Sequence, residues 1–413
     1  MKPMKVMRYG SKYRYNQSRK KNSSKGKVIA IVVSVILVIA VVLVVLRLVA
    51  INKAADDNGA INLQMHDGKP TVMEVKTGDV CMLTMPSAIN IKEVEFISSD
   101  PSIVRVDSAG HTDALAVGTA TITASARNFT AQCEFTVKEN PEPDYPDEIT
   151  TAITANEDVL AANIAAGETD LYSITANRRT NTVTVYTKDD KGEFSVPVRA
   201  MVCSCGKGGE YTTITGDFSI YFQQPWHPLY DEVYGMYVSG FKDDFLFHSV
   251  PYEEMKHDTL EVEEFNKLGE PASQGCVRMM VADVYWIMNN CAIDTPVHVI
   301  DADANSDPLG KPAAVKIPAG VKWDPTDKAV SNPYHGKLPT LEGVTDKQIK
   351  KGDTFDPMAG ITAADICGND ISNRVKLAGE VISDKPGQYY LTYTITDDFN
   401  LKTKLTRTIT VAE

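Results

Sequence analysis

Apolar residues are distributed very unevenly along this chain of 413 residues. From Val28 to Leu46 every residue is apolar except Ser34. A run of this length approaches the roughly 20 apolar residues that a helix needs to cross a bilayer. A helix satisfies its own backbone hydrogen bonds inside lipid, so the pattern predicts a transmembrane helix over residues 28–48.

The flank of this run sets its expected orientation. Residues 1–27 hold ten Lys and Arg and no Asp or Glu, which predicts a basic cytoplasmic tail and an extracellular remainder. A cleaved signal peptide is the alternative, but its apolar region is usually about 7 to 15 residues long. The longer run here, interrupted at its exit by Arg47, favours an uncleaved anchor.

Beyond the anchor, alternation of apolar and polar residues dominates and predicts a multidomain, mainly β protein. Residues 60–137 alternate in short runs separated by turn residues, which is typical of a β-sandwich. Residues 138–170 form a linker that begins with Pro and acidic residues and ends in an Ala-rich, short helical or irregular stretch. Residues 337–413 alternate again and predict a second sandwich.

Residues 171–300 combine strands with one helix. Alternation predicts strands over residues 182–186 and 194–198, joined by a hairpin, and a closing strand over 296–300. Helical spacing of Val284, Tyr285, Ile287 and Met288 predicts a helix over residues 280–290. Asp283 is then placed near the positive end of that helix. Residues 301–336, rich in Pro, Asp, Ala and Gly, form a second linker or a wrapping tail.

Charge and cysteine content narrow the function. The basic tail holds ten of the 42 Lys and Arg, so the rest of the chain is more acidic than its net charge of −12 suggests. An acidic body excludes nucleic acid as the main partner. There are seven cysteines, an odd number, so at least one thiol is unpaired within the chain.

Two cysteine pairs leave alternatives open. Cys81 and Cys133 are either small core residues or a disulfide within the first sandwich. Cys203 and Cys205 can bind a metal with Cys276 and a histidine, but no second close pair supports this. Strand cysteines near a cleft are the favoured interpretation, with no metal.

The segment that carries chemistry is residues 271–278, Pro-Ala-Ser-Gln-Gly-Cys-Val-Arg, just before the predicted helix. A cysteine near a helix N-terminus has a lowered pKa and a larger thiolate fraction. Gly275 allows close backbone approach, and N–H groups at this turn can bind an oxyanion. Cys276 is therefore the candidate nucleophile, with Arg278 adding positive charge.

A cysteine nucleophile needs a base. His248 is the best placed of the seven histidines, because it ends the predicted strand over residues 245–247 and is followed by polar Ser249. From this position the ring can project over a cleft.

These motifs resemble the L,D-transpeptidase (YkuD-type) catalytic domain over residues 171–300. The family carries a His-Gly dipeptide, then Ser-His-Gly-Cys-x-Arg before a helix, matched here by residues 248–249 and 273–278. An upstream Thr-Pro-x-Gly-x-Phe turn is matched by residues 213–218, and a closing Gly-Thr-Pro-Val by residues 294–297. The resemblance implies a β-rich fold with the cysteine in a cleft under a mobile lid.

The resemblance also implies a mechanism. Cys276 attacks the carbonyl of the third residue in a peptidoglycan stem, terminal D-alanine leaves, and a second stem's amine resolves the thioester into a 3→3 cross-link. His248 moves the protons, the Ser249 carbonyl orients its ring, and Gly275 belongs to the oxyanion hole. Ser273, Gln274 and Arg278 contact substrate, and the chemistry requires no metal or organic cofactor.

This chain departs from the family pattern at several positions. Gln274 stands where the family has histidine, and it cannot titrate. Ser249 replaces glycine beside the base, and Ile214 replaces the proline of the upstream turn. The acidic, polar residues 253–270 lengthen the gap between His248 and Cys276 and can form the lid.

The flanking sandwiches resemble bacterial immunoglobulin-like (Ig-like) domains, group 2 over residues 60–137 and another surface type over 337–413. Such modules imply spacing or adhesion.

Three functions remain in competition: a membrane-anchored L,D-transpeptidase, an L,D-carboxypeptidase with the same acyl-enzyme, and a non-catalytic wall-binding or adhesion protein. The anchor and the surface modules suggest the membrane of a Gram-positive bacterium, with peptidoglycan stem peptides as partners and roles in cell wall biogenesis and cell shape.

Overall fold

The computed structural model of the chain describes residues 60–66, 68, 70–140 and 145–413. All described residues belong to one compact unit, Asp56–Glu413. The predicted basic tail and the predicted membrane helix over residues 28–48 lie outside the described residues. Among the described residues, no helix is long and apolar enough to cross a membrane.

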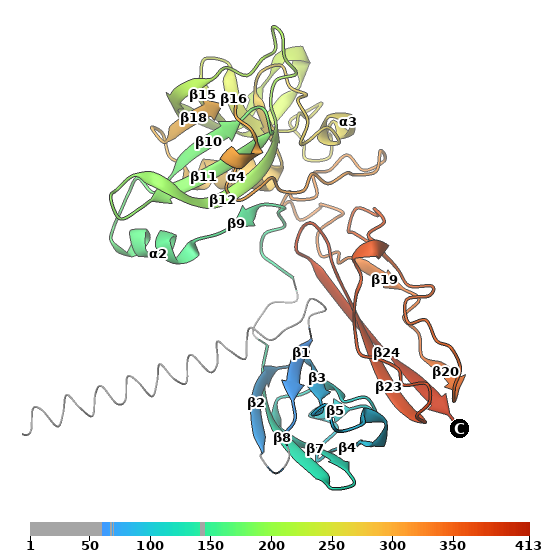
Figure 1. Cartoon of the computed structure of the whole chain (residues 1–413). Helices are drawn as coiled ribbons and strands as arrows, with labels where there is room; N and C mark the ends of the chain where they lie inside the picture. Colours follow the sequence, from blue (N-terminus) through green and yellow to red (C-terminus); the bar gives the residue numbers. More distant parts are fainter. Residues whose placement is uncertain (1–59, 67, 69, 141–144) are drawn as a thin grey trace, which may run out of the picture. The chain divides into compact units, whose positions relative to one another are not determined.

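The N-terminal domain is a sandwich of two four-stranded sheets, which confirms the predicted architecture (Figure 1). Its strands are β1 (Ile61–Gln64), β2 (Thr71–Lys76), β3 (Val80–Thr84), β4 (Glu95–Ser98), β5 (Val104–Val106), β6 (His111–Ala114), β7 (Gly118–Ala126) and β8 (Phe129–Lys138). One sheet has the order β1-β3-β6-β5 and the other β2-β8-β7-β4. Along β8 buried and exposed residues alternate almost perfectly, because one face of the strand packs on the core.

The central domain is built on a ten-stranded sheet with the order β13-β18-β10-β11-β12-β17-β16-β15-β14, and β9 pairs with β12. The strands are β9 (Ile153–Thr154), β10 (Ser173–Asn177), β11 (Thr182–Lys188), β12 (Phe194–Ser204), β13 (Gly216–Ser219), β14 (Phe222–Pro228), β15 (Tyr234–Lys242), β16 (Phe245–Ser249), β17 (Val277–Met279) and β18 (Pro296–Ile300). The predicted hairpin is confirmed as antiparallel β11 and β12, and the predicted closing strand as β18.

Three α-helices accompany this sheet: α2 (Glu157–Ala165), α3 (Val262–Phe265) and α4 (Val281–Asn290) (Figure 1). Helix α4 confirms the helix predicted over residues 280–290. Val284 and Ile287 are fully buried in the core beneath the sheet, as the helical spacing predicted, whereas Tyr285 is exposed.

Asp283 lies in the first turn of α4, as predicted, and its side chain also has partners outside the helix. Its side chain is buried and lies 3.5 Å from Nη2 of Arg199, with a hydrogen bond from Thr150 Oγ1 at 3.3 Å. Burial raises the pKa of Asp283 to about 6 despite the nearby Arg199. The Asp283 side chain therefore belongs to a buried polar cluster. Other groups accept hydrogen bonds from the first N–H groups of α4.

Those groups come from residues 311–334, which we call the strap. Asp324 Oδ2 accepts a hydrogen bond from Val281 N at 2.9 Å, and Thr326 Oγ1 accepts one from Ala282 N at 3.0 Å. These oxygens satisfy helix N–H groups that have no partner within α4. Further along, Ile317 and Asn266 exchange two hydrogen bonds of 2.8 and 2.9 Å. The segment predicted as a linker or wrapping tail thus runs against the central domain.

The C-terminal domain pairs a four-stranded sheet, β20-β24-β23-β22, with the two-stranded sheet β19-β21. Its strands are β19 (Thr340–Glu342), β20 (Lys347–Lys350), β21 (Thr362–Ala364), β22 (Lys376–Ala378), β23 (Gly387–Thr396) and β24 (Lys402–Ala412). The long β23–β24 hairpin carries the core residues Tyr389, Leu391 and Ile409, all fully buried. The predicted second sandwich is confirmed.

All seven cysteines lie in the described residues, and each has a free thiol. Cys81 and Cys133 are buried in the N-terminal sandwich, where burial raises the pKa of each thiol to about 12. Neither cysteine is joined in a disulfide, so both are core residues, the first of the two alternatives.

Candidate active site

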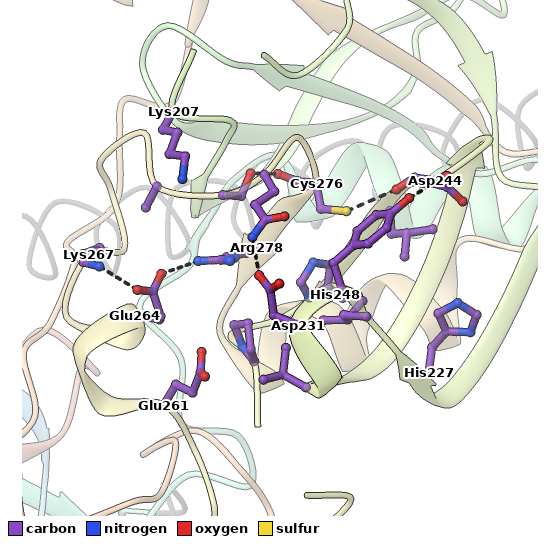
Figure 2. A pocket seen from close by; sticks show the side chains of 18 of the residues that line it. Lys207, His227, Asp231, Asp244, His248, Glu261, Glu264, Lys267, Cys276 and Arg278 are labelled. Atoms are coloured by element: carbon purple, nitrogen blue, oxygen red, sulfur yellow. Dashed lines mark hydrogen bonds and ion pairs between the residues drawn. The ribbon is translucent and has the colours of Figure 1, made fainter. Parts of the chain in front are cut away.

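Cys276 and His248 lie on neighbouring strands of the central sheet. Strands β16 and β17 run parallel, with Phe247 opposite Val277 and His248 opposite Arg278. Cys276 directly precedes β17, so the parallel register places it beside Leu246, near the start of β16. Both side chains line one cavity of about 810 Å³ (Figure 2). The structure therefore brings together the two residues predicted as nucleophile and base.

Buried hydrogen bonds shape the loop that carries the nucleophile. Ser273 Oγ donates to the Cys276 carbonyl at 2.6 Å and accepts from Gly275 N at 3.0 Å. Thr213 Oγ1 donates to the Gly275 carbonyl at 2.7 Å and accepts from Gly206 N at 2.8 Å. Gly275 has φ +125°, where a side chain would be strained, so glycine is required at this turn.

The His248 ring is held in one orientation. Its Nδ1 lies 2.6 Å from the Ser249 carbonyl, which can only accept a hydrogen bond. Nδ1 therefore carries the proton, and Nε2 is left as the acceptor in the neutral ring. Burial, reinforced by the charge of Arg278, lowers the pKa of His248 to about 3, so the ring is neutral at pH 7.

The serine beside this histidine fits without disturbing it. Ser249 Oγ donates to the Val250 carbonyl at 2.8 Å and accepts from Met236 N at 2.9 Å. The other face of the ring packs on Gly235, where a Cβ would lie 3.0–3.2 Å from His248 atoms. The space that Ser249 takes up is thus compatible with an ordered base.

Cys276 is not at a helix N-terminus, which corrects the argument for a lowered pKa. Strand β17 separates Cys276 from α4, and the helix N–H groups are capped by the strap. The thiol donates to the Asp244 carbonyl at 3.3 Å. Burial raises the pKa of Cys276 to about 11, although a backbone hydrogen bond and Arg278 oppose the shift. The resting pair is a neutral thiol and a neutral imidazole.

Gln274 contacts the tip of the β14–β15 hairpin, residues 229–233. Its Nε2 donates to Asp231 Oδ2 at 2.6 Å. On the other side of Cys276, Tyr230 Oη donates to Asp244 Oδ2 at 3.2 Å. Asp231 and Glu232 both have positive φ, at 64° and 57°. Two exposed contacts therefore hold a strained tip over the nucleophile.

The charge of Arg278 is balanced within the site. Its guanidinium pairs with Glu264 of α3, and the same carboxylate also pairs with Lys267 (Figure 2). Within residues 253–270, the segment predicted as a lid, Glu261, Glu264, Lys267 and Glu270 form one wall of the cavity. The strap contacts this segment through Asn266 and Ile317.

Residues from four segments line the cavity. They are Lys207; residues 227–233 except Glu232; Asp244, Leu246, His248 and Pro251; and Glu261, Glu264, Lys267, Glu270–Gln274, Cys276 and Arg278, with Gly275 absent from the set. The motif analysis missed Asp231, Asp244 and Glu261. The acidic insertion was the only signal that pointed to Glu261, and nothing in the sequence pointed to the other two.

In the described part of the chain, no three His, Cys, Asp or Glu side chains come together in a way that could hold a metal ion. The Cys203 and Cys205 sulfurs lie 3.9 Å apart and are fully buried. The Cys205 carbonyl accepts hydrogen bonds from Ala272 N and Ser273 N, so this pair packs behind the nucleophile loop.

A partly buried cysteine and an oriented histidine that line one cavity of a β-rich domain define a site for acyl transfer to a thiol. A family model described as the L,D-transpeptidase catalytic domain (YkuD) matches residues 171–299. A bacterial Ig-like domain (group 2) matches residues 65–137, and a bacterial surface protein Ig-like domain matches residues 339–411. The chain thus carries an L,D-transpeptidase catalytic domain, from a family of peptidoglycan cross-linking enzymes, flanked by two Ig-like domains. The three predicted resemblances are confirmed.

Individual proteins are similar to parts of this chain. The chain is 36% identical over 72 residues to the pesticidal crystal protein Cry22Aa of Bacillus thuringiensis, a match that spans 10% of that relative. Among solved structures, an L,D-transpeptidase from Stackebrandtia nassauensis is 18% identical, covering 34% of this chain and 64% of that one, with a TM-score of 0.24. An L,D-transpeptidase from Mycobacterium smegmatis is 15% identical, covering 58% and 97%, with a TM-score of 0.25.

Proposed function

We propose that this chain is a membrane-anchored L,D-transpeptidase that forms 3→3 cross-links between peptidoglycan stems through a thioester on Cys276. The observation that carries the proposal is one cavity lined by Cys276 and by a neutral His248 whose Nδ1 is held by the Ser249 carbonyl. This arrangement leaves Nε2 free to take the thiol proton.

The first half-reaction forms the acyl-enzyme. His248 Nε2 accepts the thiol proton as sulfur bonds to the carbonyl carbon of the third stem residue. The tetrahedral oxyanion collapses, the amide bond to terminal D-alanine breaks, and His248 gives the proton to the leaving amine. Because the Cys276 pKa is raised and the His248 pKa is lowered, we expect proton transfer to accompany attack.

The second half-reaction releases the enzyme. An amine of a second stem attacks the thioester, His248 takes the amine proton and returns it to sulfur, and a new amide bond joins the two stems. Gly275 is the proposed oxyanion donor, and its N–H must then exchange Ser273 Oγ for the substrate. Gln274 and Arg278 face the cavity as substrate contacts, whereas buried Ser273 holds the loop.

The location of the enzyme follows from its flanks. Bacterial Ig-like domains suggest the cell surface or envelope, and the apolar run over residues 28–48 supplies the proposed anchor. The two Ig-like domains then act as spacers between the membrane and the wall.

Product analysis tests the proposal. The full chain is incubated with a disaccharide-tetrapeptide, with and without an amine-bearing acceptor stem. Released D-alanine together with a cross-linked dimer supports transpeptidation, and free tripeptide without dimer indicates an L,D-carboxypeptidase. Neither product, with binding to purified wall, indicates an adhesion protein. Cys291→Ala is the matched control, because Cys291 is a buried cysteine of the same domain.

A further inference from the structure

The wall of the cavity formed by residues 261–270 carries charges that the catalytic motif does not explain. Glu261, Glu264, Lys267 and Glu270 all line the cavity from this segment. Figure 2 shows Glu261 and Glu264 on one side of the cavity and Cys276 on the other. A ligand whose carbonyl reaches Cys276 therefore has room to extend toward these side chains.

Most charged groups of this cavity already have partners. Glu264 pairs with both Arg278 and Lys267. Asp231 accepts a hydrogen bond from Gln274, and Asp244 accepts one from Tyr230. These contacts neutralise or solvate the charges before any ligand enters.

Glu261 differs from these groups. Its carboxylate makes no hydrogen bond or ion pair with any other described residue, although the side chain is only partly exposed. Burial raises the pKa of Glu261, and the neighbouring carboxylate of Glu264 adds to the shift, while Arg278 and Lys267 oppose it. Glu270, the other carboxylate of the cavity without such a contact, is exposed. The Glu261 carboxylate is therefore available to a cation that enters the cavity.

We propose that Glu261 is a specificity-determining residue that binds an ammonium group on the side chain of the third residue of the donor stem. The four-carbon stem of a lysine-type side chain separates its ammonium from the backbone. The cavity likewise separates Glu261 from Cys276, whose sulfur attacks the carbonyl of the third stem residue. Arg278 does not compete for this role, because Glu264 already balances its charge.

This inference rests on the proposed transpeptidase function and names the substrate class that the cavity prefers. Donor stems with a free ammonium at the third side chain acylate Cys276 faster than stems in which that group is neutral or anionic. The preference is set on the wall of residues 261–270, away from the Gln-Gly-Cys loop of residues 274–276.

The experiment compares three synthetic tetrapeptide donors that differ only at position three, with lysine, acetyl-lysine or glutamate. Acylation of the full chain is followed by intact-protein mass spectrometry for the wild type, Glu261→Gln and Glu263→Gln. Glu263 is the matched control, since it lies on the same short helix, is exposed, and does not line the cavity. Glu261 caps α3 without a side-chain hydrogen bond, so glutamine removes the charge without removing a cap.

We expect the wild type and Glu263→Gln to prefer the lysyl over the acetyl-lysyl donor by about fivefold, the effect of one partly exposed ion pair. In Glu261→Gln the lysyl and acetyl-lysyl donors should acylate Cys276 at about the same rate. The rate with the acetyl-lysyl donor should equal that of the wild type. An equal preference in Glu261→Gln and Glu263→Gln, or no preference in the wild type, overturns the inference. If no donor acylates the wild type, the proposed function fails and this inference falls with it.

Discussion

Around Cys276 and His248 the hydrogen bonds are buried and connect backbone to fixed side chains, whereas the hairpin tip across the cavity is held by two exposed side-chain contacts. Thr213 and His248 are almost fully buried, but Tyr230 is 68% exposed. The tip also carries two successive non-glycine residues with positive φ, each of which costs on the order of 1–3 kcal/mol.

This difference separates two tasks within one cavity. Buried hydrogen bonds fix the reacting atoms to the precision that acyl transfer requires. Exposed contacts on a strained tip are weak enough to be exchanged when a bulky stem enters. Changes on the buried side should therefore affect the rate of acylation strongly, and changes on the tip weakly.

The largest effect is expected from removing the base on the buried side. His248→Gln cannot accept the thiol proton, so the rate of D-alanine release should fall about a thousandfold. His227→Gln is the control, because His227 lines the same cavity from the hairpin side. A comparable loss in the His227 variant would contradict the assignment of His248.

The resting protonation state gives a second large effect. With a Cys276 pKa of about 11, the thiolate fraction rises about tenfold for each pH unit below that value. Alkylation of Cys276 by iodoacetamide should therefore be about a hundredfold faster at pH 9 than at pH 7, measured by peptide mass spectrometry. An alkylation rate that reaches its plateau below pH 8 would contradict the raised pKa of Cys276 and support the lowered pKa that was predicted from the sequence.

Packing against the His248 ring gives a third test. In Gly235→Ala the new Cβ would lie 3.0–3.2 Å from His248, which should shift the ring away from the Ser249 carbonyl. We expect acylation to slow about tenfold with the fold retained, as seen by kinetics and thermal unfolding. Gly320→Ala is the control, since a Cβ there meets no atom within 4 Å, and an equal loss in both variants would remove this explanation.

Thr213 tests the loop itself. Thr213→Val leaves the Gly275 carbonyl and Gly206 N–H without their buried partner, which should lower the free energy of unfolding by about 1–2 kcal/mol. Chemical denaturation measures the change, with exposed Thr215→Val as control. Identical stability of the two variants would show that Thr213 does not hold the loop.

The smallest effect is expected at the tip. Tyr230→Phe removes the exposed hydrogen bond to Asp244, and we expect less than about a threefold change in kcat/KM for the tetrapeptide. A loss as large as that of His248→Gln would mean that the tip takes part in the chemistry.

The sequence was sufficient for the parts of the molecule in which pattern and local geometry agree. Alternation located β11, β12 and β18, and the ordered motif located Cys276, His248 and Ser249. It failed where long-range packing decides. The helix-dipole argument for Cys276 ignored the intervening strand β17. The position of Asp283 in the first turn of α4 was predicted, but its buried partner Arg199 was not, because Arg199 lies far away in the sequence.

The opposite side of the cavity was beyond prediction for the same reason. Asp231 and Asp244 have no local pattern, and they reach the site only because β14 and β15 form the edge of the sheet beside β16. Capping of α4 by Asp324 likewise requires the strap to fold back on the domain.

Intact-protein mass spectrometry of the full chain with a disaccharide-tetrapeptide tests the central claim most directly. Our account predicts a covalent adduct of the tripeptide acyl group with release of D-alanine, present in the wild type and in Cys291→Ala and absent in Cys276→Ala. An adduct that persists in Cys276→Ala, or no adduct on folded protein with a reduced Cys276 thiol, would contradict it.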